Sequence, residues 1–173
     1  MLAQIVKQLG WFILLLLLQV LVFNHIHIAG YATPIVYLFF LLIFPSETSR
    51  IVLILSGFVA GFVFDTFSGT PGVGAATMTF MGFIRPALLR LFGPHEDDQE
   101  EYKPSRRVMG GGKYFMYLLT ASLLHSVIFF TLEAFSFFNI TTLLINIGGS
   151  TVLSTLVMLA IESIRNTVKR NRK

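Results

Sequence analysis

Cysteine is absent from this chain of 173 residues, and charged residues are scarce, at 13% of the total. Without cysteine the chain can form no disulfide, no thiolate nucleophile and no cysteine-ligated metal site. So little charge also argues against a soluble domain, which needs charged side chains over its surface. The formal net charge is +4, but the basic residues are distributed as expected for a membrane surface rather than for nucleic acid.

Long stretches without charge make up most of the sequence. With histidine taken as neutral, no residue between Lys7 and Glu47 is charged, and none between Glu133 and Glu162. A helix needs about 20 apolar residues to cross the hydrocarbon core of a bilayer. The sequence therefore predicts an all-α, polytopic membrane protein that forms a single integral domain over residues 1–173. The first run ends in NHIHI rather than in a small-residue cleavage site, so we expect a retained helix.

We expect a bundle of about six transmembrane helices joined by short loops. The six predicted segments are residues 7–23, 31–44, 51–67, 73–92, 113–135 and 141–164. The second segment is short for a full crossing, so five spans with an external N-terminus are the alternative. Neither an internal repeat nor a broken helix, the marks of an ion-coupled transporter, is evident in the sequence.

All 13 basic residues fall on one side of such a bundle. They lie near the N-terminus, in the loop before residue 51, around the loop at 93–112 and in the tail at 165–173. Because cytoplasmic loops are enriched in Lys and Arg, both termini and the 93–112 loop are predicted to be cytoplasmic. We expect this loop to be a solvated linker and the tail to lie on anionic lipid headgroups.

Asp65 is the single acidic residue in the third and fourth predicted helices. It lies near the expected outer end of the third helix, and Gly69, Pro71 and Gly72 after it favour a tight turn. A carboxylate beside the free N–H groups of the next helix accepts hydrogen bonds and complements the helix dipole. Asp65 is therefore predicted to cap the fourth helix. An ion-binding role, with Glu133 as the second available acid, is the alternative.

Two further features mark the third and fourth predicted helices. Arg85 is expected to extend to the cytoplasmic headgroups or to contact a partner, and Pro86 to kink the helix. Gly57 and Gly61 form a GxxxG motif, which lets membrane helices approach closely. We expect that motif to pack within the chain, whereas a second small and polar face at 148–155 is a candidate partner surface.

The histidines and the remaining polar residues form no recognisable catalytic pattern. His25 and His27 lie in a predicted external turn without a third ligand nearby in the sequence, so they are weak as a metal site. His125 is expected to be neutral and hydrogen-bonded to a neighbouring helix. No Ser-His-Asp pattern, phosphate-binding loop or HExxH motif occurs. The residues therefore favour a protein that is not an enzyme and needs no cofactor.

The stretch GFVAGFVFDTFSGTPGVGAATMTFMGFIRP, residues 57–86, resembles the family of the bacterial rod shape-determining protein MreD. The shared features are a GFxxG start, an Asp that ends the helix, a PG turn, an Ala-rich start of the next helix and an Arg-Pro pair. The residues that carry them here are Gly57, Phe58, Gly61, Asp65, Pro71, Gly72, Ala75, Ala76, Arg85 and Pro86. Beyond residue 92 the resemblance is one of hydropathy.

The resemblance implies a non-enzymatic scaffold in the bacterial inner membrane. Such proteins bind the single-span protein MreC and help maintain rod shape, because they couple external peptidoglycan synthases to internal MreB filaments. The family is also similar in fold to the six-helix substrate-binding subunits of energy-coupling vitamin transporters, so such a subunit is the alternative function. Those subunits dock their partner through small residues of the first helix, whereas this first helix reads WFILLLLLQVLVF.

Overall fold

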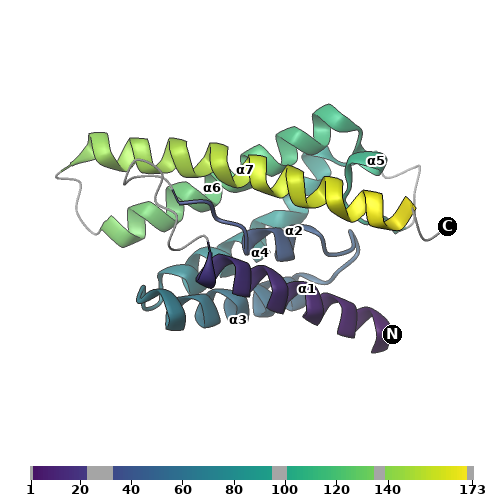
Figure 1. Cartoon of the computed structure of the whole chain (residues 1–173), viewed down its shortest axis with the longest axis horizontal. Coiled ribbons are helices and arrows are strands. Elements are labelled where there is room, and N and C mark those ends of the chain that lie inside the picture. The colour runs from purple at the N-terminus through teal and green to yellow at the C-terminus, as the bar shows by residue number, and fades with distance from the viewer. Residues whose placement is uncertain (1, 23–32, 95–100, 135–138, 171–173) are drawn as a thin grey trace.

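The structure, a computed structural model, describes residues 2–22, 33–94, 101–134 and 139–170. The regular secondary structure of these residues is helical (Figure 1). The elements are α1 (Leu2–Leu21), α2 (Leu38–Leu42), α3 (Arg50–Ser68), α4 (Val73–Phe92), α5 (Arg106–Met109), α6 (Gly111–Ala134) and α7 (Ile140–Arg170). The predicted all-α class is therefore confirmed for the described part of the chain.

Three of the described helices are long and apolar enough to cross a membrane, as judged by length and composition: residues 50–68, 111–134 and 140–165. Helix α1 contributes a shorter apolar stretch, Gly10–Leu21. Helix α4 has 20 residues, but its arginines and small residues lower its hydropathy. These helices are compatible with a membrane protein, while the count of six spans stays a prediction.

The second predicted helix is wrong as a continuous helix. Residues 33–36 have no regular secondary structure, and only the five residues of α2 are α-helical. Pro34 disfavours the helical conformation in Thr33, and the β-branched Ile35 and Val36 have low helix propensity. We call residues 33–45 the inner segment.

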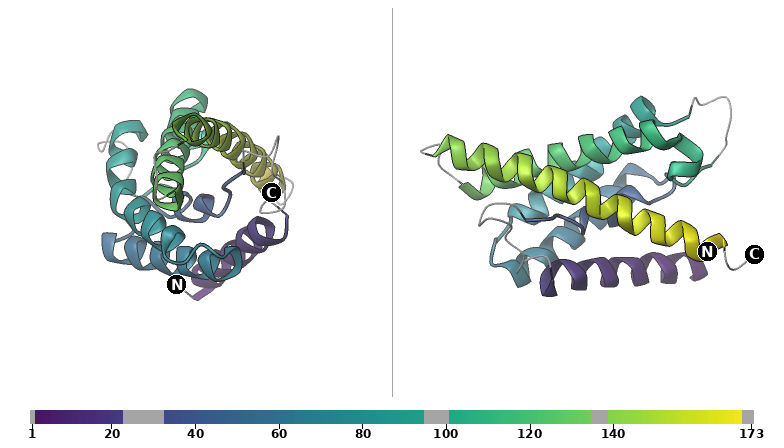
Figure 2. Two further views of the ribbon diagram at one scale, coloured as in Figure 1. Left: turned by 90° about the vertical axis from the view of Figure 1, so that its left-hand side faces the viewer. Right: turned by 45° about the horizontal axis from the view of Figure 1, so that its top comes forward.

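The inner segment is deeply buried. Its members from Val36 to Leu42 are at most 7% exposed. Figure 2 shows the long helices arranged around it. Backbone that leaves the helical conformation cannot face lipid, because its N–H and C=O groups would lack hydrogen-bond partners. A broken segment is therefore tolerated here only because the bundle encloses it.

The ends of the helices fall into two groups at opposite ends of the molecule (Figure 1). The start of α1, the start of α3, the short α5 and the C-terminal end of α7 lie at one end, which we call the basic end. The turn between α3 and α4 and the start of α7 lie at the other end. The chain regions with the predicted cytoplasmic charges thus gather at one end. Helix α7 continues to Arg170, beyond its predicted end at residue 164, so much of the predicted tail is helical.

Part of the 93–112 loop is folded against the bundle at the basic end. The backbone N–H of Ser46 donates to the carbonyl oxygen of Tyr102 at 2.8 Å, and the N–H of Tyr102 donates to Ser46 Oγ at 3.1 Å. Arg165 donates to the carbonyl oxygen of Pro104 at 3.4 Å. The prediction of a solvated linker is therefore wrong for residues 101–112, the second half of this loop, which the structure describes.

Candidate functional site

The carboxylate of Asp65 holds the start of α4. Its Oδ1 accepts hydrogen bonds from the Gly74 N–H at 2.8 Å and from the Thr70 hydroxyl at 2.9 Å. Its Oδ2 accepts from the Ala75 N–H at 2.9 Å. The side chain is 5% exposed, so these donors replace the water that the carboxylate loses on burial. The hydrogen bonds expected between Asp65 and the fourth helix are present.

The turn that brings Asp65 to α4 depends on two glycines. Gly69 ends α3 with φ of 70°, and Gly72 precedes α4 with φ of 84°. Both values lie in the left-handed region, which glycine adopts at no steric cost. Pro71 lies between them and is exposed. The predicted Gly-Thr-Pro-Gly turn is therefore present, and it places the free N–H groups of α4 against the end of α3.

Close contact between α3 and α4 depends on glycines that lack a side chain. A Cβ atom on Gly57 would collide with the carbonyl group of Met78, and one on Gly61 would collide with the carbonyl group of Gly74. From the other helix, a Cβ atom on Gly82 would lie 2.6 Å from the carbonyl oxygen of Leu53. The GxxxG motif is thus used inside the chain, and this face is unavailable to a partner.

Arg85 does not extend to the headgroups or to a partner, and that prediction is corrected. Its side chain is 0% exposed. The guanidinium donates to the carbonyl oxygens of Phe44, of Leu42 at 3.4 Å and of Pro45 at 3.4 Å. These groups belong to the end of α2 and the residues after it, whose carbonyls have no partner within the helix. Arg85 therefore stabilises the C-terminal end of the inner segment.

Tyr117 of α6 and Pro86 of α4 also lie in this region. Tyr117 of α6 also donates to the Leu42 carbonyl oxygen, at 3.3 Å. Pro86 lies inside α4, whose helical run continues to Phe92. Tyr117 was not predicted, because a tyrosine in a long apolar helix resembles an ordinary core residue.

The N-terminal end of the inner segment is held by side chains from α1 and α7. Gln19 Oε1 accepts from the Val36 N–H at 2.6 Å, and its Nε2 donates to the Pro34 carbonyl oxygen at 3.0 Å. Ser154 Oγ accepts from the Ile35 N–H at 2.7 Å. Gln19 was missed, although it is the one polar residue in the run WFILLLLLQVLVF. Such an isolated amide inside a predicted membrane helix is a usable signal for a buried partner.

The small and polar face at 148–155 is largely internal. Ser150, Thr151, Ser154 and Thr155 are at most 4% exposed, and Ser150 Oγ accepts from the Thr33 N–H at 3.0 Å. Gly148 differs, because a Cβ atom placed on it would meet no heavy atom within 4 Å. The predicted partner surface on this helix is therefore reduced to the outward side around Gly148.

His125 lies at the centre of the bundle and is 0% exposed. Its Nε2 is 3.0 Å from the hydroxyl oxygen of Tyr37, which precedes α2. The hydrogen bond of His125 was expected to reach a neighbouring helix, and its partner is instead the inner segment, at the residue before α2. His25 and His27 lie outside the described residues. Among the residues that the structure describes, no group of three or more His, Asp or Glu side chains could hold a metal ion.

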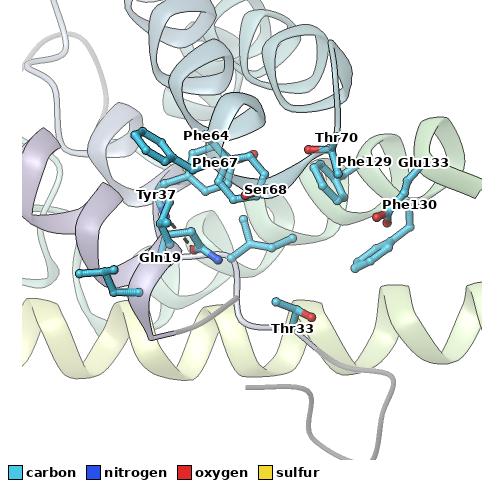
Figure 3. A pocket seen from close by; sticks show the side chains of 13 residues that line it. Gln19, Thr33, Tyr37, Phe64, Phe67, Ser68, Thr70, Phe129, Phe130 and Glu133 are labelled. Atoms are coloured by element: carbon cyan, nitrogen blue, oxygen red, sulfur yellow. Dashed lines mark hydrogen bonds between the residues drawn. The ribbon is translucent and has the colours of Figure 1, made fainter. Parts of the chain in front are cut away.

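A pocket of about 420 Å³ opens between α1, the inner segment, α3 and α6 (Figure 3). It lies at the end opposite the basic end, because its lining includes Leu21, Ser68 and Glu133, which are at or next to the ends of three helices. Five of its thirteen described lining residues are aromatic, and amide, hydroxyl and carboxylate groups are also present. This pocket was not predicted from the sequence, because the inner segment that forms its floor was expected to be a helix.

No protein-family model matches this chain, and no curated protein or solved structure matches it. The resemblance of residues 57–86 to the MreD family therefore stays a proposal. The contacts described above assign those residues to the packing, the turn and the caps of the α3–α4 hairpin.

Proposed function

We propose that this chain is a non-enzymatic membrane scaffold of the bacterial cell-elongation machinery, and that it binds the transmembrane segment of MreC. The proposal rests first on the MreD-like stretch at residues 57–86. In this account the chain lies in the inner membrane with both termini in the cytoplasm. Binding to MreC helps to organise wall synthases and MreB filaments, and so maintains rod shape.

The observation that favours a scaffold most is the complete engagement of Asp65. Its two carboxylate oxygens accept three hydrogen bonds from Thr70, Gly74 and Ala75. An acid that moves protons or cations must be reachable and must exchange partners, whereas these bonds fix a turn. This acid therefore supports a rigid hairpin rather than ion movement, and a rigid hairpin suits a protein whose task is to hold other proteins.

The outward face of α7 is the surface that we propose for MreC. Leu144, Val152 and Leu156 are 62%, 54% and 56% exposed and lie on one side of the helix with Gly148 between them. Helices associate in lipid by close van der Waals packing, because lipid tails are as apolar as leucine. Gly148, which no neighbour covers, lets a single partner helix approach the backbone of α7.

A second function is favoured by one observation, the pocket at the end opposite the basic end. A pocket of about 420 Å³ with aromatic walls has the size and chemistry of a small-molecule site. This supports the alternative of a substrate-binding subunit of a vitamin transporter. Against it, the exposed residues that follow Gly10 on α1 are large, including Ile13, Leu14 and Leu17.

Co-purification in mild detergent followed by mass spectrometry separates the two functions. The scaffold account expects MreC or a wall synthase to be recovered with the full chain. Recovery of an ATPase module without MreC would instead establish the transporter subunit. The proposed orientation is tested with Lys103→Cys and Thr141→Cys, since the native chain has no cysteine background. An impermeant thiol reagent added to intact cells should label Thr141→Cys alone.

A further inference from the structure

The side chains that line the pocket change from aromatic rings at its floor to a carboxylate at its mouth. Tyr37 is at the floor, where its ring stacks on Phe64 with centroids 4.4 Å apart. Phe64 in turn contacts Phe129 at 6.0 Å, and Phe129 contacts Phe130 at 5.5 Å. These four rings are each at most 8% exposed. They form a continuous aromatic wall between the inner segment and the last turns of α6 (Figure 3).

The mouth of the pocket carries a charged side chain, the carboxylate of Glu133. Glu133 follows Phe129 by four residues and Phe130 by three, so all three lie on the same face of α6. Figure 3 shows the three side chains together at one side of the pocket. Among the described residues that line this pocket there is no Lys, Arg or His. A carboxylate therefore lies next to aromatic rings at the mouth.

Aromatic faces and a carboxylate favour the same kind of ligand. A cation within about 6 Å of a ring centroid is attracted by the negative face of the ring, and more strongly where water is excluded. A carboxylate adds a direct electrostatic attraction, which grows as the surroundings become less polar. An anion would meet repulsion from Glu133, and an uncharged ligand would gain only from the rings and the hydroxyls.

We propose that this pocket binds an organic cation, in which an ammonium group is joined to an apolar body. The ammonium group lies at the mouth beside Glu133 and the ring of Phe130. The apolar body lies deeper, against Phe64 and Phe129, where the wall is almost fully buried. The same chemistry is offered by a soluble amine and by an ethanolamine lipid headgroup. The inference stands apart from the scaffold proposal, because ligand binding and partner capture are measured separately.

Three matched probes test the proposal on the full chain in phosphatidylglycerol nanodiscs without phosphatidylethanolamine at pH 7, with empty nanodiscs as the blank. They are phenethylammonium, the neutral 2-phenylethanol and the anionic 3-phenylpropionate. We expect saturable calorimetric binding of phenethylammonium, with at least tenfold weaker binding of the other two. Equal binding of all three probes, or no saturable binding of phenethylammonium, would overturn the proposal.

The variants Glu133→Gln and Glu47→Gln identify the site. Both glutamates are exposed, and only Glu133 lines the pocket. We expect Glu133→Gln to weaken phenethylammonium binding at least fivefold and to leave 2-phenylethanol unchanged. Glu47→Gln should bind as the unmodified chain does. Identical affinities of the two variants for phenethylammonium would rule out this pocket as the site.

A lipid arm separates the two sources of the cation. The titration is repeated in phosphatidylglycerol nanodiscs with and without phosphatidylethanolamine. Loss of phenethylammonium binding in the presence of phosphatidylethanolamine supports a lipid headgroup as the occupant. Unchanged binding supports a soluble amine. MreC recovery is read from a different experiment, so failure here leaves the scaffold proposal standing.

Discussion

The backbone N–H of Gly74 donates a hydrogen bond of 2.8 Å to the Asp65 carboxylate, across the turn that joins α3 to α4. The same carboxylate accepts from the next residue, Ala75, at 2.9 Å. One acid thus satisfies two N–H groups that the helix itself cannot pair. The position of α4 relative to α3 therefore depends on a residue of the opposite helix rather than on a local cap.

Asp65→Ala should lower the free energy of unfolding by about 2 kcal/mol or more, because it removes a cap and leaves buried N–H groups without an acceptor. Asp65→Asn should have a smaller effect, since its amide oxygen can still accept one of these bonds. The neighbouring variant Thr66→Ala is the control, because Thr66 is exposed and bonds within its own helix. Denaturant titration in detergent measures all three. An unchanged Asp65→Ala variant would show that the cap is dispensable.

Gly61→Ala should destabilise the bundle by about 1–3 kcal/mol, because the added methyl group overpacks the contact with the backbone of α4. Gly148→Ala makes the same chemical change on a helix where no neighbour is within 4 Å. It should leave stability unchanged or raise it by about 0.5–1 kcal/mol. Thermal unfolding in mild detergent compares the two. Equal melting temperatures would contradict the close packing of α3 on α4.

Arg85→Met should destabilise the chain by about 2 kcal/mol or more, although it also removes a buried charge. The change removes the donor that reaches the Phe44 carbonyl group, and water cannot replace it at a 0% exposed site. Arg85→Lys should recover part of the loss, since an ammonium group cannot span all the carbonyls. Arg90→Met on the same helix is the exposed control. A more stable Arg85→Met variant would mean that desolvation of the guanidinium outweighs its hydrogen bonds.

Gln19→Met should cost about 1–3 kcal/mol, because it removes the acceptor of the buried Val36 N–H at nearly constant volume. Amide hydrogen exchange offers a local readout, since the Val36 amide should exchange faster while amides of α3 stay protected. Thr66→Val, which removes an exposed hydroxyl, should leave both protected. Unchanged exchange at Val36 in Gln19→Met would show that another group accepts this hydrogen bond.

Local signals predicted most of the helices and the Asp65 cap. Helix α4 begins and ends where it was predicted, because a Pro-Gly turn and the loop at residue 93 delimit it in the sequence. The inner segment was not predicted, since its hydrogen bonds come from Gln19 and Ser154, which are distant in sequence. Apolar composition reports burial but does not distinguish a helix from an extended chain.

The contacts of Arg85 were not predicted either, because they too join residues that are distant in sequence. A lone arginine near a helix end is usually solvated, so the expectation of a headgroup contact followed from the sequence. Its real partners exist only because α2 ends beside α4 in space. The pocket depends on the inner segment too, and so it could not be placed before the fold was known.

The most direct test of the scaffold proposal is fluorescence energy transfer between this chain and the labelled transmembrane segment of MreC, reconstituted together in nanodiscs. The account predicts saturable transfer with the unmodified chain and with Gly148→Ala. It predicts at least a tenfold loss of affinity with Gly148→Leu, whose side chain blocks close approach to the outward face of α7. Absence of transfer with the unmodified chain would contradict the account.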